Sequence, residues 1–129
     1  MPWGLPMLVT EFDVTVPNER LRADYTRDFL TLCFSHPGMT GILVWGFWEP
    51  AQWRPEASFF KEDWSLTPVG EQWVELVGKQ WRTDAKLVTD DKGKVKLRAF
   101  QGKYTASAKG VSTVFHLGKS DVFVQLPLK

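Results

Sequence analysis

The chain has 129 residues, a net charge of +1 and a pI near 7.9, and its length is that of one small domain. This near-neutral balance gives no electrostatic basis for binding nucleic acid or an anionic membrane surface. No apolar run approaches the roughly 20 residues of a membrane-spanning helix, and no segment has the pattern of a signal peptide. We therefore expect neither a nucleic-acid nor a membrane partner, and the compartment stays open.

Aromatic residues are unusually frequent, at 14% of the chain, and seven of them are tryptophan. A core of this size needs only about two or three such large rings. Surplus tryptophan can stack on sugar rings, whose C–H faces pack on indole, or can fill an oligomer interface. The composition thus favours a carbohydrate ligand or self-association.

Metal and cofactor chemistry finds no support in the sequence. Cys33 is the only cysteine, and its apolar setting predicts a buried, inert thiol. His36 and His116 have no cysteine or acid at ligand spacing. No glycine-rich phosphate loop or serine nucleophile elbow is present, so we expect no cofactor.

The first part of the chain predicts a strand and then a helix. Residues 7–14 form an apolar run typical of a strand that is buried on both faces. Asn18 is the expected N-cap of the helix, which ends at 36–38, where Pro37 disfavours helix in the preceding residue. The predicted apolar stripe of this helix consists of Leu21, Tyr25, Phe29, Leu32 and Cys33.

A second strand and a second helix follow. Residues 40–48 predict another buried strand of the parallel type, and an aromatic loop rich in proline leads to Thr67-Pro68, which predicts the start of a helix. Its expected inner face consists of Val69, Trp73, Leu76, Val77 and Gln80. Residues 1–83 therefore predict a βαβα unit.

Short runs at 95–100, 103–109, 111–117 and 121–126 indicate antiparallel strands, separated by turns at Gln101-Gly102, Lys109-Gly110 and 118–121. The turn at 90–93 is expected to open a hairpin, and apolar and charged residues alternate over 95–100 and again over 121–126. This pattern predicts an antiparallel sheet with one wet face, or a small sandwich.

The stretch GLPMLVTEFDV contains Thr10, Glu11, Phe12 and Asp13. It resembles the nucleophile motif of glycoside hydrolase family 10, the retaining endo-xylanases built on a (β/α)8 barrel. SHPGMTGILVWGFWEPAQWRP is similar to the eighth barrel strand and its loop, and LTPVGEQWVELVGKQWRTDA is similar to the last barrel helix. DDKGKVKLRAFQGKYTASAKG looks like a β-rich extension of some members, so the resemblance covers essentially the whole chain.

The resemblance implies an α/β plus β fold. Residues 1–83 would be a partial (β/α)8 barrel, namely its last two βα units, and residues 84–129 a small antiparallel β-rich C-terminal region. Barrel strands one to six, and with them the acid/base motif on strand four, do not match any part of the sequence. Two strands and two helices cannot bury both faces of their sheet, so we expect a homo-oligomer; the alternatives are that the tail covers the sheet or that the segment refolds.

Three carboxylates are candidates for the chemistry. By the resemblance, Glu11 is the nucleophile at the C-terminal end of a strand, where barrel enzymes carry their catalytic groups. Asp13 is then an orienting neighbour of Glu11 or, alternatively, a cap before the helix. Glu49 follows the second strand and is either a substitute proton donor or a solvated loop residue.

The tryptophans after the second strand are candidates for substrate binding. By the resemblance, Trp45 and Trp53 wall the sugar cleft. Trp48, Trp64 and Arg54 are additional candidates for substrate contacts. Trp45 could equally belong to the core.

Three functions remain open at the level of sequence. The first is a truncated, family 10-like retaining glycoside hydrolase that acts on β-1,4-xylan or a related β-glycan. The second is a non-catalytic polysaccharide-binding module that uses Trp45 and Trp53, and the third is an inactive structural remnant. The resemblance favours the hydrolase, whose partner would be a xylan-like polysaccharide or oligosaccharide; family relatives are often secreted, but the localisation of this chain is unknown.

Overall fold

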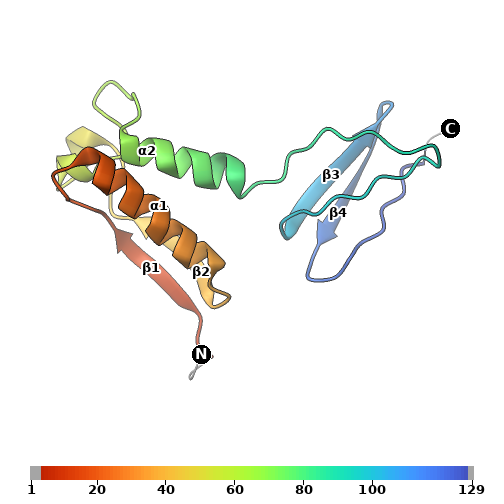
Figure 1. Cartoon of the computed structure of the whole chain (residues 1–129), viewed down its shortest axis with the longest axis horizontal. Helices are drawn as coiled ribbons and strands as arrows, with labels where there is room; N and C mark the ends of the chain where they lie inside the picture. The colour runs from red at the N-terminus through yellow and green to blue at the C-terminus, as the bar shows by residue number, and fades with distance from the viewer. Residues whose placement is uncertain (1–3, 128–129) are drawn as a thin grey trace. The chain divides into compact units, whose positions relative to one another are not determined.

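The computed structural model describes residues 4–127 and forms two compact units, which divide between Gln80 and Trp81. Unit 1 is the α/β part and unit 2 the β part (Figure 1). The sequence places its change of composition slightly later, after residue 83. Within residues 4–127 no helix has the length and apolar character needed to cross a membrane.

Unit 1 alternates strands and helices. The elements are β1 (Met7–Phe12), α1 (Glu19–Ser35), β2 (Met39–Val44), the 3-10 turns η1 (Glu49–Ala51) and η2 (Pro55–Ala57), α2 (Pro68–Trp73) and its π-helical continuation η3 (Val74–Gln80). β1 and β2 pair in parallel, and α1 packs against both α2 and β2. The βαβα order expected from the sequence is therefore present.

Both strands of unit 1 are shorter than the predictions of 7–14 and 40–48. β2 ends at Val44 because the chain beyond it turns to another partner. The carbonyl oxygen of Phe47 accepts hydrogen bonds from the amides of Phe59 and Phe60 at 2.9 and 2.8 Å. The end of the predicted strand thus pairs with the loop that precedes α2.

The local chemistry at the start of each helix matches the sequence. The Asn18 side chain accepts a hydrogen bond from the Leu21 amide at 2.9 Å, and α1 ends at Ser35. Thr67 Oγ1 accepts from the Gly70 amide at 3.2 Å, with Pro68 in the first turn of α2. The predicted starts of both helices and the predicted end of α1 are therefore confirmed. The two caps form as expected because they depend on neighbouring residues alone.

The predicted inner faces of the helices are partly wrong. Leu21, Tyr25 and Leu32 are more than half exposed, and Gln80 on the second helix is exposed. The face of α1 that packs inward instead consists of Arg22, Ala23, Thr26, Leu30 and Cys33. Thr26 tolerates full burial because its hydroxyl donates to the Arg22 carbonyl at 2.9 Å. The neighbouring elements, rather than hydrophobicity alone, select the buried face.

Unit 2 is built on one hairpin, formed by β3 (Gly102–Ala108) and β4 (Val111–Leu117), which pair antiparallel. Lys109 and Gly110 make the turn with φ values of 49° and 78°, as a primed two-residue hairpin turn requires. On one face the rings of Tyr104 and Phe115 stack with centroids 5.6 Å apart. This hairpin confirms two of the predicted strands.

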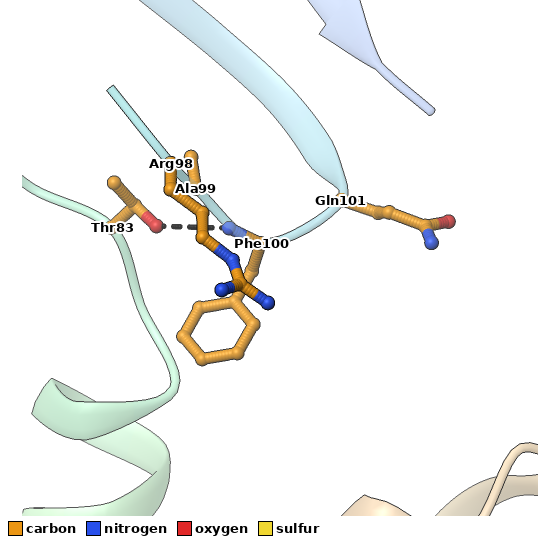
Figure 2. Close-up of a pocket in the computed structure, with 5 residues that line it drawn as sticks. All are labelled: Thr83, Arg98, Ala99, Phe100 and Gln101. Carbon is orange, nitrogen blue, oxygen red and sulfur yellow. Dashed lines mark hydrogen bonds between the residues drawn. The ribbon is translucent and has the colours of Figure 1, made fainter. Parts of the chain in front are cut away.

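The strands predicted at 95–100 and 121–126 do not form. The first segment makes other hydrogen bonds at its end: the Phe100 amide donates to Thr83 Oγ1 at 3.2 Å, and the Phe100 carbonyl accepts from the Tyr104 hydroxyl at 2.6 Å. Figure 2 shows the hollow that results, lined by Thr83 and residues 98–101. Alternation of side chains gives strand propensity, but a strand also needs a partner edge.

Cys33 provides a test of the core of unit 1. The thiol is buried, and this burial raises its pKa, so little of the reactive thiolate forms at pH 8. We expect Ellman's reagent to label the native chain at least about 100-fold more slowly than the chain in urea, because labelling requires local unfolding. Absorbance of the released thionitrobenzoate measures this rate, and equal rates in the two states would show that the thiol is accessible.

Candidate functional site

The candidate site begins at the C-terminal end of β1, where the strand register shifts. Three residue steps along β1, from Val9 to Phe12, match two steps along β2, from Ile42 to Val44. The extra residue places Thr10 and Glu11 next to each other on exposed surface. Bulges of this kind re-aim side chains and are frequent beside active sites, so the irregularity presents the Glu11 carboxylate to solvent.

Phe12 fixes this end of the strand to the core. Its ring is 6% exposed and stacks on Phe29 of α1 with centroids 4.7 Å apart. Its carbonyl oxygen accepts a hydrogen bond from the Trp45 amide at 3.1 Å. Phe12 is thus anchored on both sides, and it holds the end of β1 that carries Glu11 against the core.

Trp53 is attached to the same end of the sheet through Asp13. The indole N–H of Trp53 donates to Asp13 Oδ2 at 2.7 Å, a contact between residues 40 positions apart. The guanidinium of Arg54 lies over the Trp53 ring, 4.6 Å from its centroid. The Trp53 side chain nevertheless remains 61% exposed. An open aromatic face with a polar edge and a cation behind it is a suitable surface for a pyranose ring.

Trp45 lies at the end of β2 and is 53% exposed, so it is outside the core. The site therefore places Glu11, Trp45, Asp13, Trp53 and Arg54 around the C-terminal ends of two parallel strands. In α/β barrels these ends carry the catalytic and binding residues.

Gln52 contributes to this arrangement although nothing in the sequence singled it out. It is 6% exposed, and its side-chain amide donates to the Gly46 carbonyl at 3.3 Å. A Cβ atom at position 46 would overlap the Gln52 side chain. The glycine after Trp45 therefore makes room for Gln52, which fixes the loop between Trp45 and Trp53. A glycine directly after a strand tryptophan was the available signal.

The other two candidates are engaged elsewhere. Glu49 Oε2 accepts a hydrogen bond from the Glu62 amide at 3.1 Å, so this carboxylate is tied to the loop that precedes α2. The indole N–H of Trp48 donates to the Glu62 carbonyl at 3.3 Å, and its ring stacks on Trp64. Over residues 4–127 no group of three or more histidine, cysteine, aspartate or glutamate side chains could hold a metal ion.

Comparison with known proteins gives the chain relatives of two kinds. No protein-family model matches it. It is 39% identical over 102 residues to the anti-sigma-I factor RsgI6 of Acetivibrio thermocellus, covering 78% of this chain and 13% of that protein. It is 32% identical over 123 residues to endo-1,4-beta-xylanase 1 of Arabidopsis thaliana, covering 92% and 13%, and 31% identical over 102 residues to endo-1,4-beta-xylanase 2 of the same plant, covering 79% and 10%.

These alignments concern only a segment of each relative, because the chain spans 10% to 13% of their length. Two of the three are endo-1,4-beta-xylanases, and one alignment with them covers nearly the whole of this chain. The chain is therefore xylanase-like, since it is similar to a segment of plant endo-1,4-beta-xylanases.

Proposed function

We propose that unit 1 carries the nucleophile and one sugar-binding wall of a retaining glycoside hydrolase of family 10, acting on β-1,4-xylan or a related β-glycan. The observation that carries this proposal is the register shift that exposes Glu11 at the end of β1. The wall is made by Trp45 and by Trp53, which is held by Asp13 and backed by Arg54. β1, α1, β2 and α2 would then be the last two βα units of a (β/α)8 barrel.

In this proposal the Glu11 carboxylate attacks the anomeric carbon of the sugar. The bond from that carbon to the leaving oxygen breaks while a second carboxyl group, about 5 to 5.5 Å from the first, protonates the leaving oxygen. Water then attacks the covalent glycosyl ester, helped by the second group acting as a base, and Glu11 is released. The configuration at the anomeric carbon is thereby retained.

The second carboxyl group is proposed to come from outside the two βα units of one chain. Glu49 is the sequence-based candidate within the unit, but its carboxylate is already held by the Glu62 amide. A second copy of the chain, or polypeptide beyond these 129 residues, would supply the acid. The exposed surface of unit 1 supports such a partner, because β1 and β2 pair only with each other among the described residues.

Self-association is part of this proposal and can be measured. Leu8 and Leu43 lie on the two strands and are 51% and 54% exposed, and apolar side chains at open strand edges favour pairing with another chain. We expect multi-angle light scattering to give at least the mass of a dimer. Leu43→Lys should lower that mass, whereas a monomeric wild-type chain would contradict the assembly.

Covalent trapping tests the nucleophile without requiring the acid. In 2,4-dinitrophenyl 2-deoxy-2-fluoro-β-xylobioside the leaving group departs without protonation, and the fluorine slows hydrolysis of the ester that forms. We expect the sugar to accumulate on the peptide that contains Glu11 and to be located there by tandem mass spectrometry. Absence of an adduct, or an adduct on another residue, would contradict the assignment.

Polysaccharide binding without cleavage is the second candidate function. The exposed Trp53 ring with its Arg54 backing favours it, since this surface is complete within one chain. One relative is also named as an anti-sigma factor and not as an enzyme. Retention on xylan that Trp53→Ala abolishes, together with no covalent trapping at Glu11, would select this candidate.

A further inference from the structure

The loop that leads into α2 carries a second group of aromatic rings, centred on Trp64. The Trp64 ring stacks on Trp48 with centroids 5.3 Å apart and planes 13° apart. The rings of Phe47 and Phe60 lie 6.5 and 6.0 Å from it. We call these four residues the Trp64 cluster. Although Trp48 covers one face of the indole, Trp64 remains 58% exposed, and Figure 1 shows the loop before α2 projecting from unit 1.

The backbone holds Trp64 in a conformation that a bulky residue rarely adopts. Its φ angle is 65°, in the left-handed region that glycine occupies without strain. The turn is held by the Lys61 amide, which donates to the Ser65 carbonyl at 2.8 Å, and by Asp63 Oδ1, which accepts from the Ser65 amide and hydroxyl at 2.9 and 2.6 Å. Stability alone would favour glycine here, so the strained position points to a use for the indole.

The outward side of Trp64 offers the groups that a sugar needs. Among residues 4–127, none accepts a hydrogen bond from its indole N–H, and the residue is 58% exposed beside its three ring neighbours. Charged side chains surround it in the same loop: Lys61, Glu62 and Asp63 are all exposed. Hydrogen bonds from Ser65 lower the pKa of Asp63, so its carboxylate is ionised and can accept hydrogen bonds from hydroxyl groups. A single flat apolar face with a charged rim suits one pyranose ring, whereas a stable protein interface needs a much larger buried surface.

The Trp64 cluster is connected along the chain to the proposed sugar wall. Phe47 belongs to the segment that follows β2, two residues after Trp45, and its carbonyl oxygen binds the amides of Phe59 and Phe60. The indole N–H of Trp48 already donates to the Glu62 carbonyl, and its ring is covered by Trp64. Trp48, which the sequence suggested as a direct substrate contact, thus acts through Trp64.

We propose that the Trp64 cluster is a second glycan-binding surface, on which one pyranose unit of a β-linked polysaccharide stacks at a position separate from the Trp53–Arg54 wall. The choice of a β-glycan as occupant rests on the proposed function. A polymer that touches both surfaces gains affinity from their linkage, so the effect should be large for xylan and small for xylobiose.

The test uses the full chain and the variant Trp64→Gly. Glycine removes the ring but also relieves the backbone, and the relieved strain offsets much of the lost stacking, so we expect the thermal unfolding temperature to fall by only a few degrees. Affinity electrophoresis in gels that contain soluble xylan should show binding weakened about tenfold. Phe123→Ala is the matched control, because Phe123 is an exposed aromatic residue of unit 2 at 82%, and it should bind as wild type does.

A further variant separates ring stacking from folding. Trp64→Phe keeps a flat ring and should recover part of the affinity that Trp64→Gly loses. Wild-type affinity in Trp64→Gly, or affinity that follows unfolding temperature across the variants, would overturn the proposal. Two outcomes separate this proposal from the proposed function. If an adduct forms at Glu11 but binding to xylan does not depend on Trp64, only the glycan-binding role of the Trp64 cluster is refuted. If binding to xylan depends on Trp64 but no adduct forms, only the role of Glu11 as nucleophile is refuted.

Discussion

Glu11→Gln is expected to lower the burst rate of dinitrophenolate release from 2,4-dinitrophenyl β-xylobioside by about 10⁴-fold or more, in line with the loss of a nucleophile in other enzymes. The amide has almost the volume of the carboxylate, so the fold of unit 1 should not change. It has no negative charge, however, and cannot form the glycosyl ester. Because the leaving group needs no proton, this loss is independent of the source of the acid. Stopped-flow absorbance measures the burst.

Two controls make this result specific. Glu49→Gln removes the same charge in the turn η1 that follows the neighbouring strand, and it should retain the wild-type burst because its carboxylate holds the Glu62 amide. Xylohexaose affinity of Glu11→Gln should remain close to wild type, since Trp45 and Trp53 are untouched. A burst that survives in Glu11→Gln would show that Glu11 is not the nucleophile. A burst lost equally in Glu49→Gln would show that the loss is not specific to Glu11.

The features that the sequence predicts well are those set by adjacent residues. The caps at Asn18 and Thr67 are present, because a side-chain oxygen bonds an amide three residues later regardless of the remaining fold. The hairpin turn at Lys109-Gly110 is similarly local. The burial of Cys33 also matches its apolar setting.

The features that the sequence predicts poorly depend on distant partners. The buried face of α1 includes Arg22 and Thr26 because of what packs against the helix, and no periodicity of apolar residues can reveal that. β2 ends early because Phe47 binds residues of the loop before α2. In unit 2 the segment before β3 is tied to Thr83 instead of forming a strand.

The residues of the candidate site fall into the same two groups, those predictable from local sequence and those that depend on distant partners. A strand-end glutamate and surplus tryptophans could be selected from the sequence, since their residue types suggest the chemistry. The register shift that exposes Glu11 and the hydrogen bond from Trp53 to Asp13 could not, because one depends on the pairing of β1 with β2 and the other joins residues 40 positions apart. Gln52 was missed for the same reason, as its role exists only against Gly46.

Gly70→Ala is expected to destabilise unit 1 by about 2 to 3 kcal/mol, the usual range for an added group in a closed core position. A Cβ atom at position 70 would overlap the carbonyl oxygen of Phe59, and it would also lie 2.9 Å from Leu66 Cδ2. The overlap is with backbone, which cannot rotate away. That carbonyl also accepts hydrogen bonds from the Thr67 amide at 3.0 Å and the Thr67 hydroxyl at 3.2 Å, so moving it would weaken the start of α2.

Gly78→Ala is the matched control on the same helical segment. The nearest atom to a Cβ there is Val74 Cγ1, at an ordinary contact distance of 3.7 Å, and Gly78 is exposed. Alanine should therefore be neutral or stabilising by up to about 1 kcal/mol, as expected for glycine replaced within a helix. Urea titration followed by the rate of Cys33 labelling reports unit 1 in both variants. Equal stability of the two variants would show that α2 is free to move away from Phe59. A loss confined to Gly70→Ala means instead that a glycine is required where α2 packs on the loop carrying Trp53 and Trp64, so that the support of the binding surfaces and the core of unit 1 depend on the same contact.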